Sequence, residues 1–265
     1  MIALNEKLNY QVTTASRVMI GSKVIESVQD RWVELKLTDK NDQNLLFGYT
    51  LLDQTMEGNA LIHQWAEDME WVQSPLFFLT DLHGKFAGMQ GLQQIKERWD
   101  EEYRYKLAKK HKDLPALKEL LEETDALLND KKRLVQNFIG YSHYRAFFQP
   151  IYNIDAGSST SNYTINNFFG KASLPLIVDQ ETRADHHQMF ISNSGVLDRK
   201  NFDAKFFNRM LKDLTNTYNL KVDLSAELQE NYTVDDRGLE SADLFLECYV
   251  PDFYQITNAH QIKRI

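Results

Sequence analysis

The sequence predicts an α+β fold in which antiparallel sheets are flanked by helices, with two β-hairpin-plus-helix units linked by a helical hairpin. Residues Leu76–Trp99 indicate a strand, a tight turn at Gly84, a short strand and then an amphipathic helix. Residues Gln188–Met210 follow the same plan, with the turn at Gly195. A leucine-rich stretch with helical spacing lies between these two units, and it supplies the predicted helical hairpin.

Apolar residues recur at the same distances from the two turn glycines. The second, eleventh and fifteenth residues after each glycine are apolar: Phe86 and Leu197, Ile95 and Phe206, Trp99 and Met210. Identity between the copies is close to nil, so the plan indicates a recurring structural solution and not a duplication. We therefore expect Gly84 and Gly195 to lie in tight turns, each followed closely by a helix.

The chain is divided into three parts at its clearest breaks. Residues 1–112 are predicted to form a β-meander with the first hairpin-helix unit, and residues 113–150 a helical linker. Residues 151–265 are predicted to hold the second unit with further antiparallel strands. The polar run at 155–162, DAGSSTSN, is predicted to be a loop or a domain boundary.

In the first part, alternating apolar residues predict the meander over residues 8–52, with turns at Gly21, at Gln29-Asp30 and at 39–44. A helix is predicted over 59–72 with Asn59 as its cap, and the helix of the first unit is predicted to run to about Lys110.

The linker is predicted to hold a helix beginning near Pro115 and a second one that carries Leu134 and Ile139. Beyond it, strands are predicted within 163–182, over 220–228 and over 242–250, with a turn at 235–238. The tail after 252 contains strand-forming residues, so we expect it to pair into a sheet.

Composition restricts the function classes. The 265 residues carry a net charge of −8, which disfavours nucleic acid and anionic membranes as partners. No stretch approaches the roughly 18 apolar residues of a membrane span, and no signal peptide is visible, so a cytoplasmic location is predicted. The single cysteine, Cys248, allows no intrachain disulfide and is predicted to be a buried small hydrophobe.

No catalytic residue, metal ligand or cofactor is predicted. The sequence lacks the phosphate-binding, nucleophile-elbow and zinc-protease motifs. Asp185-His186-His187 is the most tempting cluster, but adjacent strand residues point to opposite faces, which favours a solvated turn. His63 and Glu67 share a helix face and could hold a divalent metal with outside ligands, but a surface pair is the preferred interpretation.

An aromatic run after Gly140 is the candidate for binding a ligand or a partner. Dense aromatic residues can line a cavity or an interface, and an arginine among them could anchor a polar group. The alternative, which we favour, is a bulky core in which Phe147 is buried while Tyr144 keeps its hydroxyl in water. The candidate residues are Tyr141, His143, Tyr144, Arg145, Phe148 and Tyr152.

The function predicted first is a non-catalytic protein-interaction module, such as a subunit of an assembly or an acidic partner that neutralises a basic protein. The acidic composition and the missing catalytic motifs favour it. The first alternative is a small-molecule or lipid-binding module that uses the aromatic run. Curved antiparallel sheets that wrap helices also occur in carriers of apolar ligands. The second alternative is a hydrolase with a non-local site around His186 or His63.

Overall fold

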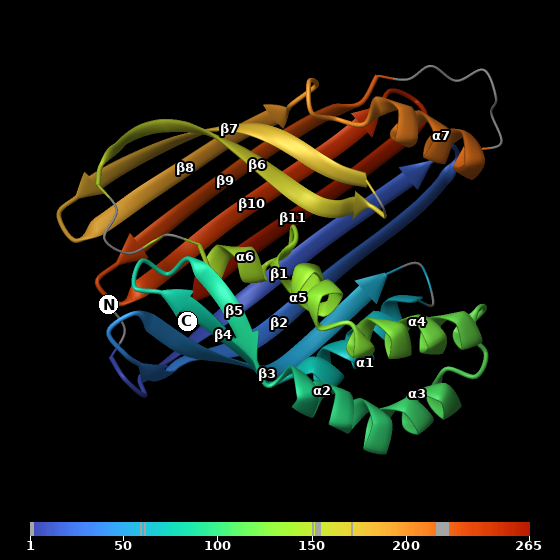
Figure 1. The fold of residues 1–265 in the computed structure, drawn as a ribbon, viewed down its shortest axis with the longest axis horizontal. Helices are drawn as coiled ribbons and strands as arrows, with labels where there is room; N and C mark the ends of the chain where they lie inside the picture. The colour runs from blue at the N-terminus through green and yellow to red at the C-terminus, as the bar shows by residue number, and fades with distance from the viewer. Residues whose placement is uncertain are drawn as a thin grey trace.

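A single antiparallel sheet of eleven strands dominates the computed structural model (Figure 1). The structure describes residues 3–58, 60, 62–149, 151, 155–170, 172–215 and 223–265. The strands lie in the order β5-β4-β3-β2-β1-β11-β10-β9-β8-β7-β6. Their bounds are β1 Lys7–Ile20, β2 Lys23–Lys40, β3 Asn44–Gly58, β4 Leu76–Asp81, β5 Phe86–Gln90, β6 Gly157–Phe169, β7 Ala172–Asp185, β8 Gln188–Leu197, β9 Ser225–Asp235, β10 Gly238–Val250 and β11 Tyr254–Arg264.

The helices lie on one side of the sheet (Figure 1). Most of them fall in the middle of the chain, between β3 and β6, and α7 follows β8. Their bounds are α1 Ile62–Gln73, α2 Leu92–Arg98, the π-helical turn η1 Trp99–Tyr103, α3 Arg104–Lys110, α4 Leu117–Asn129, α5 Lys131–Ile139, α6 Tyr144–Phe147 and α7 Ala204–Thr215.

The predicted fold class is therefore wrong: one large sheet replaces two hairpin-plus-helix units. Strands β1 and β11 pair along their lengths, and this pairing joins the two halves of the chain into one sheet. Sequence alternation identifies strands but not their partners, so the pairing between chain ends was not foreseen. The division at 112/113 and 150/151 stays a prediction.

The prediction of a second hairpin-plus-helix unit is wrong at Gly195. The first unit is as expected, because Gly84 lies in the turn between β4 and β5 at a φ of 86° and α2 follows. Gly195 instead lies inside β8, paired with Val178 on one side and Leu228 on the other. A Cβ at this position would lie 3.1 Å from side-chain atoms of both neighbours. The glycine thus allows close packing and makes no turn.

Two further expectations are corrected. The polar run 155–162 enters strand β6, whose residues are polar because this edge strand is exposed on most positions. Gln29 and Asp30 lie inside β2 and form no turn. Gln29 is buried and donates a hydrogen bond to the Gln54 side chain in β3, so a polar residue is accommodated within the strand.

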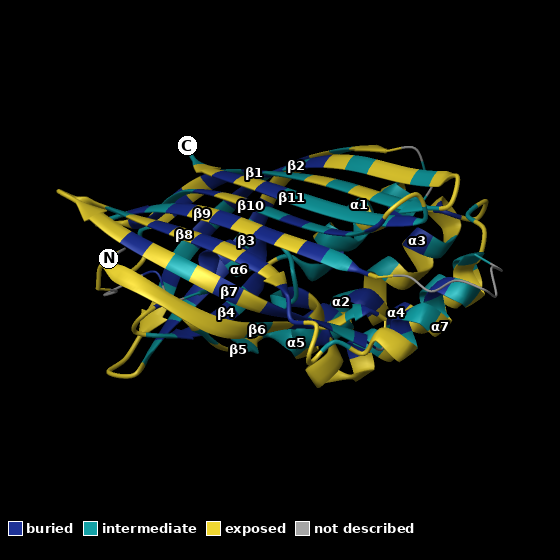
Figure 2. Cartoon of the chain, turned by 90° about the horizontal axis from the view of Figure 1, so that it is seen from above, coloured by how far each residue is buried: buried dark blue, intermediate teal, exposed yellow. Residues whose placement is uncertain are grey.

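The sheet buries one face and leaves the other largely exposed (Figure 2). Two apolar clusters lie on the buried face. The larger contains β1–β4 residues, residues of α1–α6 and a few from β8–β11. The smaller joins residues of β6–β11 to Phe207 and Leu211 of α7. Cys248 is fully buried in the smaller cluster, as expected.

No helix in the described ranges combines the length and the apolar character needed to cross a membrane. The cytoplasmic location stays a prediction.

Gly195→Val tests the packing explanation. The added side chain meets Val178 and Leu228 at 3.1 Å, so we expect the free energy of unfolding to fall by about 1–3 kcal/mol. Gly88→Val is the matched control, since a Cβ on Gly88 in β5 meets nothing within 4 Å. Urea denaturation measures both. Equal losses in the two variants would contradict close packing at Gly195.

Candidate functional site

The predicted aromatic run forms α6 and its flanks inside the curve of the sheet (Figure 1). His143, Tyr144 and Phe148 are buried, at 4%, 6% and 6% exposure, while the Arg145 side chain is 16% exposed. The hydroxyl of Tyr141 is buried and makes no hydrogen bond within the described chain. Tyr152 lies outside the described residues.

Aromatic stacking fixes α6 against the sheet. Phe147 is 3% exposed, as expected, and its ring meets Tyr10 of β1 edge-on at 5.0 Å between centroids. The expected exposure of Tyr144 is wrong, because its ring packs on Tyr49 of β3 at 5.0 Å and its hydroxyl is also buried. Phe148 stacks on Phe78 of β4 at 4.0 Å. These rings are part of the larger core.

Arg145 makes a buried ion pair with Glu230 of β9. Its Nε lies 2.8 Å from Oε1 of Glu230, a residue with no exposed surface. Asn193 of β8 donates to the other carboxylate oxygen at 2.8 Å. The guanidinium also lies over the ring of Tyr163 in β6, at 3.9 Å from the centroid. Burial lowers the pKa of Arg145, but the Glu230 carboxylate, together with Tyr163 and Tyr232, leaves the pKa raised, so the arginine stays charged.

Glu230 belongs to a row of polar side chains that crosses the apolar face of the sheet, which we call the polar row. Each member lies directly opposite the next in the strand register, and Leu244 is the one apolar position within it. The row separates the two apolar clusters, because Tyr232 lies on one side of Glu230 and Leu228 on the other. From β2 to β7 it comprises Gln29, Thr14, His260, Leu244, Glu230, Asn193 and Gln180.

Two buried histidines belong to this region: His260 is a member of the polar row, and His143 lies beside it. Nε2 of His143 is 3.0 Å from the hydroxyl of Tyr49, and Nδ1 of His260 is 3.0 Å from that of Thr14. Their ring centroids are 6.2 Å apart. Burial, followed by the charge of Arg31, lowers the pKa of His260 to about 4. The same causes, with His260 itself, hold the pKa of His143 well below its usual value. Both imidazoles are neutral at pH 7.

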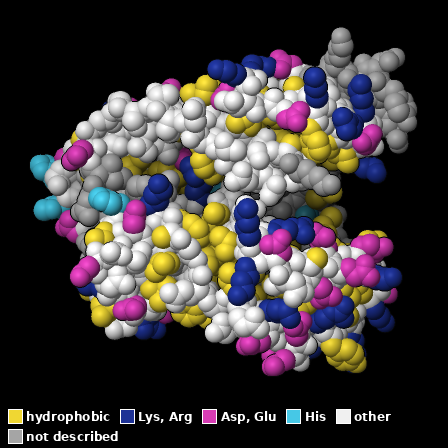
Figure 3. Space-filling model, viewed as in Figure 1, with side chains coloured by type: hydrophobic (Ala, Val, Ile, Leu, Met, Phe, Trp, Pro, Cys, Tyr) yellow, Lys and Arg dark blue, Asp and Glu magenta, His cyan; other side chains and the backbone are white. Residues whose placement is uncertain are grey.

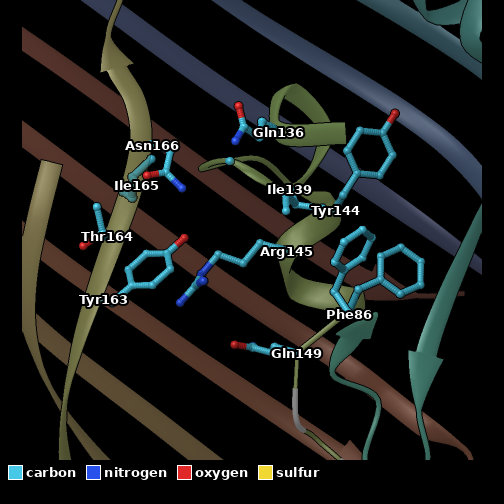
Figure 4. Close-up of a pocket in the computed structure, with 12 residues that line it drawn as sticks. Phe86, Gln136, Ile139, Tyr144, Arg145, Gln149, Tyr163, Thr164, Ile165 and Asn166 are labelled. Carbon is cyan, nitrogen blue, oxygen red and sulfur yellow. The ribbon is translucent and has the colours of Figure 1, made fainter. Parts of the chain in front are cut away.

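A cavity of about 190 Å³ opens beside the ion pair (Figure 4). Its walls come from both edge strands of the sheet, β5 and β6, and from α5 and α6. The apolar part of the lining is Phe86, Ile139, Tyr144, Phe148 and Ile165, and the polar part is Gln136, Arg145, Gln149, Tyr163, Thr164 and Asn166.

The cavity adjoins a larger groove of about 1150 Å³ between β6 and the helices α4 and α5. Gln136, Gly140, Ile165 and Asn166 line both spaces. Figure 3 shows hydrophobic side chains gathered in the middle of this face of the molecule. Cavity and groove together form a concave site that combines aromatic walls with a few fixed polar groups.

The histidines considered as metal ligands or catalytic groups lie elsewhere. The side chains of His186 and His187 are 91% and 89% exposed in the β7–β8 turn, as expected for a solvated turn. His63 lies beside Gly58 at the start of α1. Within the described ranges, no three His, Cys, Asp or Glu side chains gather into a possible metal site.

Sequence reasoning missed Glu230 and Tyr163, which complete the site from β9 and β6. Glu230 carries a readable signal, since it falls between Leu228 and Tyr232 at an inward position of an alternating strand. A charge at such a position requires a partner from elsewhere in the chain. Nothing comparable distinguishes Tyr163.

No family model matches the chain, and no curated protein matches it. A solved structure described as "lipid-protein interactions in lipovitellin" is similar over 100% of this chain, with a TM-score of 0.55 and 10% sequence identity. The chain spans 25% of the length of that lipovitellin chain. At this identity the similarity shows the fold alone.

Arg145→Met tests the ion pair. Loss of the guanidinium leaves Glu230 charged and buried without a cation, so we expect the free energy of unfolding to fall by about 3–5 kcal/mol. The double variant Arg145→Met/Glu230→Gln removes the unpaired charge and keeps an acceptor for Asn193. Chemical denaturation should show that the double variant recovers most of the lost free energy of unfolding. An equal loss in single and double variants would show that the charge of Glu230 is unimportant.

The buried histidines predict acid sensitivity. A histidine in the unfolded chain binds a proton below about pH 6.5, whereas His143 and His260 in the fold stay neutral to lower pH. The unfolded state then binds more protons, so stability should fall as the pH drops from about 6.5 toward about 4, by up to about 1.4 kcal/mol per pH unit for each histidine.

Chemical denaturation at a series of pH values measures this slope. His260→Gln should reduce it, whereas His187→Gln, at an exposed position, should leave it unchanged. The idea fails if His260→Gln retains the full pH dependence of the parent protein.

Proposed function

We propose that this protein binds an apolar or amphipathic small molecule of the lipid class in the cavity beside α6 and in the adjoining groove. The observation that carries the proposal is the aromatic-walled cavity held between the two edge strands of one curved sheet (Figure 4). The fold similarity to a lipovitellin chain studied for lipid–protein interactions supports the same ligand class.

The size of the two spaces indicates how such a ligand would lie. An engineered cavity of about 150 Å³ in another protein takes up benzene, so the 190 Å³ cavity accommodates one end of an apolar ligand. Ligand pockets commonly measure about 300–1,000 Å³, a size that the larger groove provides. The remainder of the ligand would therefore extend along the groove between β6 and α5.

The electrostatics favour an uncharged group at the deep end. Arg145 is neutralised by Glu230 and covered by Tyr163, so it acts as a fixed wall and offers no unpaired positive charge. A carboxylate or phosphate placed there would have to compete with Glu230. The side chains of Gln136, Thr164 and Asn166 provide neutral hydrogen-bonding groups around the cavity.

Ile139→Trp tests the proposal by filling the cavity. Ile139 lies on its wall and is only partly buried, so the larger side chain can enter the open space without displacing packed atoms. We expect the affinity for a fluorescent fatty-acid analogue to fall at least tenfold, which corresponds to about 1.4 kcal/mol. Fluorescence titration measures the change.

Val196→Trp is the control, since Val196 is 57% exposed on β8 and does not line the cavity. It should bind the probe like the parent protein. Mass spectrometry of organic extracts should also find lipid that copurifies with the parent protein in greater amount than with Ile139→Trp. Absence of probe binding and of copurified lipid would refute the proposal.

A further inference from the structure

Strand β6 leaves a long edge of the sheet unpaired. It stands last in the strand order, and β7 is its partner within the sheet. Positions 157–162 are all exposed, and Figure 2 shows this strand as an almost continuous exposed ribbon. Its 13 residues, GSSTSNYTINNFF, contain no charged residue and no proline.

Such an edge exposes a row of free backbone N–H and C=O groups that can pair with another chain. A long unprotected edge is therefore unusual. Proteins commonly protect edges by shortness, charged side chains, proline, bulges or a covering segment. The opposite edge, β5, is protected in this way: it has 5 residues, and the N–H of Phe86 donates to the carbonyl of Phe148 at 3.1 Å. From Gly157 to Ile165, β6 has a regular register and none of these features.

We propose that β6 pairs antiparallel with β6 of a second copy of this chain, about a two-fold axis at Thr160. Charge favours this edge over other surfaces. The chain carries a net charge of −8, so two copies repel each other, and β6 contributes nothing to that repulsion. Asp179 of β7, which accepts a hydrogen bond from Thr160, would lie about 14 Å from its symmetry mate, three strand spacings away. That separation exceeds the screening length of about 8 Å.

The sequence of the strand is self-complementary about this axis. Ser158 would face Asn162 of the other copy, Ser159 would face Ser161, and Thr160 would face itself. Hydroxyl and amide side chains directly opposite each other form favourable cross-strand pairs. Tyr163, which covers Arg145, lies at the end of the paired segment. The dimer would thus place two ligand cavities beside one shared strand pair, and it does not depend on what those cavities bind.

Size-exclusion chromatography with light scattering tests the pairing. The parent protein should be a dimer, and Ser159→Lys/Ser161→Lys should be a monomer because each lysine faces a lysine of the other copy. Ser192→Lys/Ser194→Lys is the matched control: it makes the same charge change at the same spacing on exposed positions of β8, an interior strand. This control should stay dimeric, and circular dichroism should show that both variants are folded.

A cysteine at the axis tests the register. Thr160→Cys should form a disulfide-linked dimer on mild oxidation, because residues directly opposite in an antiparallel pair have Cα atoms about 4.5–5.5 Å apart. Ser194→Cys should not, and the native Cys248 is fully buried. A monomeric parent protein, a dimer that survives Ser159→Lys/Ser161→Lys, or no cross-linked dimer from Thr160→Cys would each overturn the proposal. If the parent protein is monomeric, the occupant to consider for the β6 edge is an extended peptide of another protein.

Discussion

The position of Glu230 constrains how the rest of the molecule is arranged. A carboxylate with no exposed surface lies in the middle of an otherwise largely apolar sheet face, and such a charge requires a cation and hydrogen-bond donors around it. Arg145 supplies the cation from α6, and Asn193 supplies a donor from the neighbouring strand. Helix α6 must therefore lie close enough for the Arg145 side chain to reach β9. The aromatic residues of α6 and its flanks pack against the sheet, and two of them, Tyr144 and Phe148, also line the cavity that remains between α6 and the edge strands.

The sequence reveals much of the local structure and little of the topology. The N-terminal meander apart from its expected turn at Gln29-Asp30, the helices of the middle segment, β10, β11 and the turn at 235–238 follow from alternation, helical spacing and turn residues, whereas the strand predicted over 220–228 meets β9 only at 225–228. Gly195 was misread because a glycine inside a strand can reflect either a turn or close packing, and only the neighbours Val178 and Leu228 decide between them. The polar stretch before Tyr163 was misread as a loop because an edge strand exposed on both faces lacks alternation.

Only part of the candidate site could be predicted from the sequence. A dense aromatic run around Arg145 is a local feature, so its residues could be singled out from sequence. Its partner Glu230 is separated from it by a long stretch of chain, and although Tyr163 lies in the next strand, no pattern predicts which strands meet α6. The burial of Tyr144 was missed for the same reason: helical spacing places it off the main stripe, but Tyr49 of β3, Phe78 of β4 and Phe138 of α5 cover that side too.

The polar row also has a role in specifying the fold. Alternation forbids a strand to slip by one residue, because every inward side chain would then turn outward, but it permits a slip by two. A slip of two between β8 and β9 would set Glu230 opposite Ile191 or Gly195 and leave Asn193 against an apolar neighbour. The same cost, a buried polar side chain that loses its polar neighbour, opposes a slip of each strand that contributes a polar group to the row. The polar row thus specifies one register between neighbouring strands, which the alternation of a long and mostly apolar sheet does not specify by itself.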